Sequence, residues 1–166
     1  MPTEISGATG VNKVQSSAIE TGDLPTGSVL QVVHGSYSTT IASTSASFVT
    51  AGTSATITPS STSSKIYIIA NQHVRIVKSD TDVGVGFAIK RGSTTVQSTA
   101  TSYAFYTYHG ANNYSEIRAY QPLQYLDSPN TTSATTYTIY FSVYSGTGQA
   151  NEASNPSLIT LMEIAG

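Results

Sequence analysis

The sequence predicts an all-β protein whose antiparallel strands form two packed sheets, as in a sandwich or a barrel. Apolar, β-branched and aromatic residues recur at every second position in several runs, which is the period of a half-buried strand. From Ser28 onward, glycine, proline and asparagine separate these runs at short intervals. No stretch has the spacing of a convincing amphipathic helix, so helix is at most a minor component.

The predicted strands follow these runs in order. We expect them at Ser28 to Tyr37, Ala46 to Val49, Ala55 to Thr58, Lys65 to Val77, Val83 to Arg91, Thr94 to Gln97, Tyr114 to Leu126, Thr136 to Tyr144 and Leu158 to Ile164. Arg91-Gly92-Ser93 is a predicted hairpin turn, because glycine adopts positive φ without strain. The predicted core residues are Ile66, Ile68, Val85, Phe87, Ile139, Phe141, Leu158 and Leu161.

The segment from Ser54 to Ile69, SATITPSSTSSKIYII, is the most informative part of the chain. Its first residues alternate small polar with apolar side chains. Pro59 lacks a backbone donor and has a fixed φ, so the strand before it must end there. Hydroxyl residues that favour turns follow, and a β-branched and aromatic run begins at Lys65. The segment predicts a strand, a Pro-Ser turn and a second strand.

The composition limits the functions that the chain can have. It has 166 residues, enough for one domain with a real core, and only 10% are charged. Serine and threonine together fill 50 positions, so hydroxyl groups supply much of the polarity. The net charge of -2 predicts no nucleic-acid binding, which needs a basic surface. There is no cysteine, as suits a reducing cytoplasm, and no apolar run long enough to predict export or membrane insertion.

Residues 1–27 are predicted to form an extended N-terminal docking arm, and residues 28–166 the β domain. Glycine and proline are frequent in the arm and apolar residues are sparse, so it buries too little surface to fold alone. We expect it to order against a partner. Its apolar side chains are spaced as separate anchoring points: Ile5, Val11, Val14, Ile19 and Leu24.

No motif identifies a reaction, and we predict neither enzymatic activity nor a cofactor. His34, His73 and His109 lack local metal-binding spacing, so a metal site would need neighbouring strands or a threefold axis to gather them. The sequence around Asp80 and Asp82 lacks most ligands of a calcium loop. A pair of carboxylates could serve glycoside hydrolysis only if the fold brought them together.

Aromatic residues are concentrated between Tyr103 and Tyr125, in a chain without tryptophan. Tyrosine combines a flat apolar face with a hydroxyl group, which suits sugar stacking and also protein interfaces. The candidate glycan or partner contacts are Tyr103, Tyr106, Tyr108 and Tyr114. Alternatively, alternate members of this group face the core while the others form a subunit contact.

The strand from Thr136 to Tyr144 is apolar on both faces. Tyr137, Ile139, Phe141 and Val143 share one face, and Thr138, Tyr140, Ser142 and Tyr144 share the other. A strand of this kind suits a position covered by the opposing sheet on one side and by a neighbouring subunit on the other. Tyr140 and Tyr144 are therefore candidate subunit-interface residues.

Three segments resemble small virion surface and fibre-tip proteins of tailed bacteriophages, particularly those of marine and cyanobacterial hosts. They are Gly22 to Val33 (GDLPTGSVLQVV), Ser54 to Ala70 (SATITPSSTSSKIYIIA) and Ser157 to Gly166 (SLITLMEIAG), about a quarter of the chain. The resemblance implies a jelly-roll-like β-sandwich assembled as a homotrimer. It also implies a structural protein of the virion surface that is made in the cytoplasm of the bacterial host.

Within this group, a compact domain with an N-terminal tether is typical of a capsid decoration, or cement, protein. The resemblance then implies that the arm binds the major capsid protein or another virion protein. The alternative is a tail-fibre or tail-tip knob that binds host surface polysaccharide through the tyrosine-rich loops.

Overall fold

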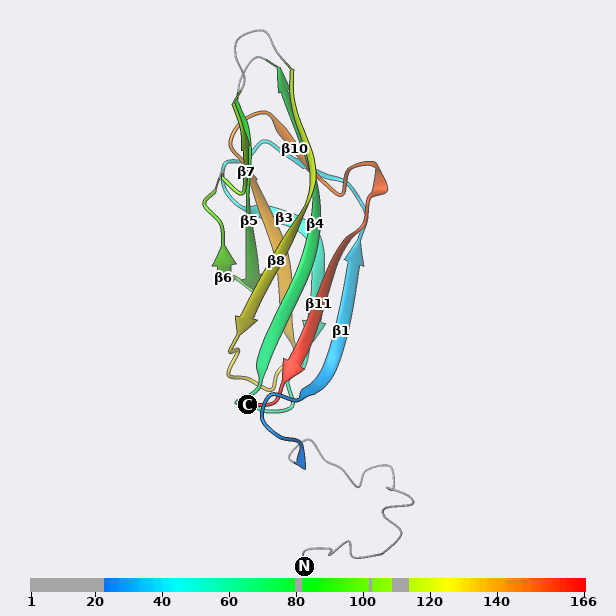
Figure 1. Cartoon of the computed structure of the whole chain (residues 1–166), viewed down its shortest axis with the longest axis vertical. Helices are drawn as coiled ribbons and strands as arrows, with labels where there is room; N and C mark the ends of the chain where they lie inside the picture. The colour runs from blue at the N-terminus through cyan, green and yellow to red at the C-terminus, as the bar shows by residue number, and fades with distance from the viewer. Residues whose placement is uncertain (1–22, 80–81, 102, 109–113) are drawn as a thin grey trace, which may run out of the picture.

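The computed structural model describes residues 23–79, 82–101, 103–108 and 114–166. They form two antiparallel sheets packed face to face, which confirms the predicted fold class (Figure 1). The strands in these residues are β1 (Val29–Tyr37), β2 (Ile41–Ser43), β3 (Val49–Ile57), β4 (Lys65–Ser79), β5 (Val83–Arg91), β6 (Thr94–Ser98), β7 (Phe105–Thr107), β8 (Tyr114–Asp127), β9 (Thr135–Val143), β10 (Thr147–Ala150) and β11 (Ser157–Ile164). A short 3-10 helix, η2 (Glu152–Ser154), separates β10 from β11.

The connectivity of the described strands is that of a jelly roll. One sheet has the order β1-β11-β4-β10-β2 with β8 on the other edge of β4, and the second has the order β3-β9-β5-β6 with β7 also on β5. Three pairs each act as one interrupted strand: β10 and β11 both lie along one edge of β4, β6 and β7 both lie along one edge of β5, and β1 and β2 pair with β11 and β10. Counted in this way, eight strands have the orders 1-8-3-6 and 2-7-4-5, which define the jelly roll.

The core lies between the sheets and follows the alternation of the strands. Seven of the eight predicted core residues are fully buried, the largest being Phe87 and Phe141. Leu158 is the exception: it is 40% exposed, on the outer face of β11, so its prediction as a core residue was wrong. Side chains alternate between faces, so Leu158 and Leu161 cannot both point inward, and Ile159 takes the inner position.

The structure corrects two strand predictions. Residues 46–48 are not a strand, because the Ser45 side chain accepts a bond from Ser47 N and donates to Ser47 O, which closes a tight turn. The predicted strand from Ala55 instead begins at Val49, as part of β3, and ends at Ile57, before Pro59. Three short strands, β2, β7 and β10, were not predicted, since each has too few residues to show an alternating pattern.

A buried polar network fixes the interruption between β10 and β11. Asn151 adopts left-handed backbone angles (φ 56°) and its side-chain amide donates to Thr39 O and Ala51 O. The Gln72 amide donates to the Asn151 and Ser157 side chains at 3.1 and 2.9 Å. These groups are fully buried, so their mutual hydrogen bonds replace those that water would make.

A second buried network lies at the end of the sandwich that carries the C-terminus, which we call the base (Figure 1). Glu163 is fully buried, and its carboxylate accepts hydrogen bonds from Ser60 N and Ser60 Oγ, both at 2.7 Å, and from Gln31 Nε2 at 2.6 Å. Gln31 Nε2 also donates to Thr58 O. Burial acts to raise the pKa of Glu163, but these donors outweigh it and hold the pKa below its usual value.

The Glu163 network predicts acid-sensitive stability. A carboxylate whose pKa is lower in the folded than in the unfolded chain stabilises the fold above its unfolded pKa, near 4.5, and that contribution is lost as pH falls through the folded pKa. In Glu163→Gln the amide keeps one acceptor oxygen, but its NH2 group must face a donor of Ser60 or Gln31, which should lower the free energy of unfolding at pH 7 by about 2 to 4 kcal/mol. Urea unfolding measured between about pH 7 and pH 3 should also show a flatter pH dependence in the variant.

Glu152→Gln is the matched control, because the Glu152 side chain is partly exposed and its ion pair with Arg118 is long, at 3.8 Å. Its effect at pH 7 should stay below about 1 kcal/mol. Equal effects of the two substitutions would contradict the role assigned to Glu163.

Candidate functional site

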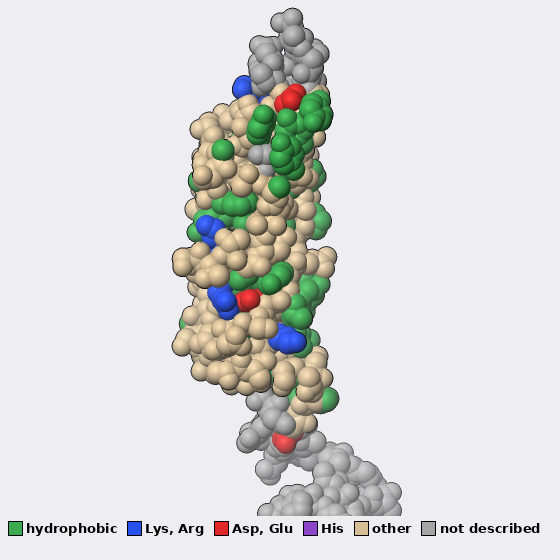
Figure 2. Space-filling model, turned by 90° about the vertical axis from the view of Figure 1, so that its left-hand side faces the viewer, with side chains coloured by type: hydrophobic (Ala, Val, Ile, Leu, Met, Phe, Trp, Pro, Cys, Tyr) green, Lys and Arg blue, Asp and Glu red, His purple; other side chains and the backbone are tan. Residues whose placement is uncertain are grey.

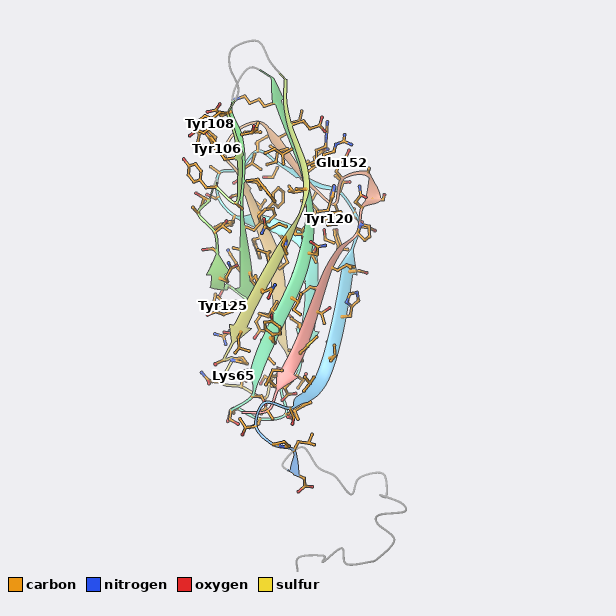
Figure 3. All side chains as sticks on the ribbon, in the orientation of Figure 1. Lys65, Tyr106, Tyr108, Tyr120, Tyr125 and Glu152 are labelled. Carbon is orange, nitrogen blue, oxygen red and sulfur yellow. The ribbon has the colours of Figure 1, made fainter. Side chains whose placement is uncertain are left out.

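Four tyrosines gather at the end of the sandwich opposite the base, and we call this cluster the tyrosine tip: Tyr103, Tyr106, Tyr108 and Tyr144. The ring centroid of Tyr106 lies 5.2 Å from that of Tyr103, 4.9 Å from that of Tyr108 and 5.5 Å from that of Tyr144. Figure 3 places Tyr106 and Tyr108 beside each other near β7, and Figure 2 shows hydrophobic side chains gathered next to an acidic one at this end. The tip is therefore a compact aromatic surface.

Backbone register explains how the tip forms. Strand β7 pairs with β5 so that Tyr106 lies opposite Gly84, and on the other edge of β5 the Tyr144 N–H donates to Gly84 O at 2.9 Å. Gly84 has no side chain, so the rings on its two sides can approach each other across it. Phe105 points the other way and packs edge-on against the core residue Phe87. This contact fixes β7 to the sandwich.

Asp82 holds the central ring of the tip. The Tyr106 hydroxyl donates to Asp82 Oδ2 at 3.0 Å. Burial, the hydrogen bond to Asp82 and the negative charge of that carboxylate all raise the pKa of Tyr106, so its hydroxyl stays protonated and continues to donate. The tip thus has a fixed central tyrosine surrounded by three more exposed ones.

The segment that leads into the tip packs closely on β5. The Ser142 hydroxyl donates to Thr101 O, and the Phe87 N–H donates to Thr99 Oγ1 at 2.8 Å. A Cβ atom on Gly86 would clash with Ala100 O and would lie 2.7 Å from the Thr101 carbonyl carbon. The small residues of the sequence VGVGFAIK therefore let this segment cover the outer face of β5.

The base has a cavity of about 280 Å³ where the first described residues enter the domain. Leu24 and Leu30 line it together with serines of the turn after β3 and with Ala165 and Gly166. The Gly27 N–H donates to Ala165 O at 2.8 Å, so backbone contacts with the domain already begin before β1. Leu24, a predicted arm residue, is 37% exposed and contributes to this cavity.

The outer face of the β1-β11-β4-β8 sheet carries an apolar band. Register places Leu126, Tyr67, Met162 and Val32 in one row across the four strands. Ile69 and Leu158 lie on the same face in the next two rows, and we include them in the band. The exposed fractions of Val32, Leu126, Leu158 and Ile69 range from 57% to 38%. The band was not predicted from the sequence. Its row depends on the pairing of four strands, and Leu158 was predicted to lie in the core.

The same face carries a charged cluster toward the tip. Glu116 accepts from Arg75 Nε at 2.7 Å and from Arg118 Nε at 2.5 Å. The hydrogen bonds from Arg75 and Arg118 lower the pKa of Glu116 to about 2. Arg118 also lies 3.8 Å from Glu152, so two cations and two anions balance each other on this part of the sheet.

His73 lies beside this cluster, buried under Tyr120 at a ring-centroid distance of 4.9 Å. Burial lowers its pKa against the opposing charge of Glu152. His34 instead lies 3.2 Å from Thr160 Oγ1. Among the described residues no three His, Asp or Glu side chains are grouped so that they could hold a metal ion, and His109 lies outside those residues.

In the same part of the chain, no helix is both long and apolar enough to cross a membrane.

The structure brings some predicted site residues together and separates others. Tyr103, Tyr106 and Tyr108 converge at the tip, where Tyr144 joins them. Tyr140 lies apart, half-buried on the outer face of β9, with Lys90 Nζ 4.3 Å from the centre of its ring. Their functional roles remain predictions. The arm residues Ile5, Val11, Val14 and Ile19, and the Tyr114 side chain, lie outside what the structure describes.

Comparisons with known proteins place the chain in no family. No protein-family model matches the sequence, and no curated protein matches it. A search of solved structures matches chains of infectious bursal disease virus structures. They include the Gt strain (TM-score 0.38, 11% identity, 82% of this chain and 38% of that chain) and the VP2 subviral particle (TM-score 0.39, 12% identity, 84% of this chain and 39% of that chain). The chain thus spans less than two fifths of these neighbours, and likeness at this level carries no argument about function.

The close packing beneath the tip predicts that Gly86→Ala is destabilising. The added methyl group would meet the Ala100 and Thr101 backbone, which cannot move without breaking the cover over β5, and the expected loss is about 3 kcal/mol. Gly92→Ala is the matched control: its Cβ would meet no atom within 4 Å, and only the positive φ (56°) opposes it, at about 1 kcal/mol. Thermal unfolding should rank the variants in this order, and the reverse order would refute the packing argument.

Proposed function

We propose that the chain is a structural protein of a virus particle, a capsid decoration protein that attaches through its N-terminal arm. The observation that carries the proposal is the polarity of the domain. The first described residues from Asp23 and the C-terminal Gly166 lie at the base, and the tyrosine tip lies at the opposite end (Figures 1 and 3). A particle held by residues 1–22 would therefore contact the base and leave the tip directed outward.

The construction of the base supports attachment at that end. The Gly27 N–H donates to Ala165 O and the Ala165 N–H donates to Ser28 O, so the start of β1 is joined to the end of β11. The Glu163 network fixes the adjacent turn. Force or torsion on the arm is thus transmitted to hydrogen-bonded strands rather than to a loop. The jelly-roll fold is one that capsid proteins and lectins share, so it is compatible with this role.

Removal of residues 1–22 tests the proposal. The deletion keeps Leu24 and Gly27, which contact the domain, so the truncated protein should fold with an unchanged thermal midpoint and circular dichroism spectrum. Purified full-length protein should bind virus particles produced without it, in a copy number that scales with the capsid protein, and the truncated protein should not. Binding of the truncation at the full-length level would disprove attachment through the arm.

The predicted homotrimer has a better candidate interface than Tyr140 and Tyr144. The apolar band crosses four strands, whereas the outer face of the other sheet presents hydroxyl groups, such as those of Thr56 and Thr136, which lie 2.7 Å apart. Solvent-facing antiparallel sheets are normally polar on their outer side, so the band indicates a contact. We propose that a second copy of the chain covers the band. The charged cluster next to the band has two cations and two anions, so it would not repel the same cluster on another copy.

A charge placed in the band should separate the copies. In Val32→Asp combined with Leu126→Asp, each carboxylate would be desolvated in the contact, which costs several kcal/mol and should reduce the assembly to monomers. Ser54→Asp on the outer face of β3 is the control and should leave the mass unchanged. Sedimentation equilibrium at micromolar concentration measures the outcome. A monomeric native protein, or dissociation caused by Ser54→Asp, would refute this interface.

A further inference from the structure

We infer that the tyrosine tip is a binding site for a neutral oligosaccharide, whose sugar rings stack on the exposed tyrosines. Tyr108, Tyr103 and Tyr144 are 80%, 63% and 50% exposed although each carries a large apolar ring. The C–H face of a sugar ring is apolar and its edge carries hydroxyl groups. Tyrosine matches both, because it offers a flat ring and a hydroxyl that donates and accepts.

The size of the tip decides between a sugar and a protein as its ligand. Three tyrosines at these exposures offer on the order of 400 Å² of surface. A standard protein interface needs about 800 Å² from each partner, mostly around aliphatic and aromatic anchors. Among the described residues, the exposed aliphatic side chains lie elsewhere and do not extend the tip: Val32, Ile69, Leu126 and Leu158 are in the band, and Leu24 and Val29 are at the base. The area of the tip suits a few sugar rings.

The tip is also preorganised for stacking. Tyr106 is held by its place opposite Gly84 in the ladder and by its bond to Asp82, and Tyr144 is held by its backbone bond to Gly84. A platform whose central ring is fixed before binding loses little conformational entropy when the ligand arrives. Tyrosine adds to this advantage because it has only two side-chain torsions to order.

The charge of the tip favours a neutral ligand. Among the residues that the structure describes, the charged group that contacts the aromatic cluster is the Asp82 carboxylate, and its charge helps to raise the pKa of Tyr106. An acidic sugar bound over the same rings would meet this negative charge at low screening. Lys78, a cation at the same end of the sandwich, donates to Ser145 Oγ at 2.6 Å, and among the described residues the cation–ring contact is that of Lys90 with Tyr140, away from the tip. A neutral oligosaccharide avoids the repulsion and keeps the stacking.

The test uses the purified full-length protein without virus particles, so its result is independent of the attachment proposal. Maltohexaose, cellohexaose and chitohexaose are the neutral probes, and sialyllactose is the anionic one. Titrations followed by the aromatic NMR signals should show saturable binding of at least one neutral probe, with a Kd of about 0.1 to 1 mM, and no binding of sialyllactose.

Variants locate the site. Tyr108→Ala should weaken binding about tenfold or more, Tyr108→Phe should retain most of it because stacking remains, and the combined Tyr103→Ala, Tyr108→Ala and Tyr144→Ala variant should abolish it. Tyr120→Ala is the matched control: Tyr120 is 43% exposed on the outer face of β8, away from the tip, and its loss should leave the affinity unchanged. Absence of saturable binding by every neutral probe would overturn the inference. So would stronger binding of sialyllactose, or equal losses in the Tyr108→Ala and Tyr120→Ala variants.

Discussion

The buried carboxylate of Glu163 is the constraint on which the arrangement of the base depends. A carboxylate removed from water is stable only if hydrogen-bond donors replace the water. Its donors come from Gln31 and Ser60, which lie 132 and 103 positions away along the chain. One group therefore fixes the register of β11 against β1 and the position of the turn after β3 at the same time. Pro59 helps, because it ends the preceding strand and leaves the Ser60 N–H outside the ladder.

This constraint also explains why the two ends of the domain differ. The first and last strands of a jelly roll are neighbours, so the two ends of the described chain meet at the base, where Gly27 bonds to Ala165 and the Glu163 network joins β11 to β1. In the described residues, the connections at the other end carry no equivalent buried charge. The residues near β7 are held instead by one short ladder, by the close packing of Gly86 and by the Tyr106 hydrogen bond. A rigid base and a surface-built tip suit an attachment end and a recognition end.

Sequence patterns predicted what depends on neighbours along the chain and missed what depends on pairing between strands. Alternation identified the inner residues of β9 correctly, because Ile139 and Phe141 belong to one period-two run. It failed at Leu158, because both faces of β11 are apolar and period alone does not say which face is inner. The three segments that carry the phage resemblance supply Gln31, Ser60 and Glu163, yet their convergence depends on tertiary structure that no local pattern contains.

The tip was predictable in composition but not in geometry. The concentration of tyrosines after Tyr103 was visible in the sequence. That Tyr144 meets Tyr106 across Gly84 depends on the register of β9, β5 and β7, which follows from packing of the whole sandwich. Tyr144 was predicted at a subunit interface, a role that stays a prediction, and the structure places its ring 5.5 Å from that of Tyr106 in the tip.

The apolar band and the tyrosine tip have different chemistry, and their positions connect the two proposals. The band is largely aliphatic and runs along one side of the domain, so copies joined there with parallel long axes would direct all their tips the same way. A single tip that binds a neutral sugar weakly would then act in concert with its neighbours, and several weak contacts to one polysaccharide would sum to durable binding. Under this geometry the affinity of one tip need not be high, which is consistent with a site made of three exposed rings instead of a deep pocket.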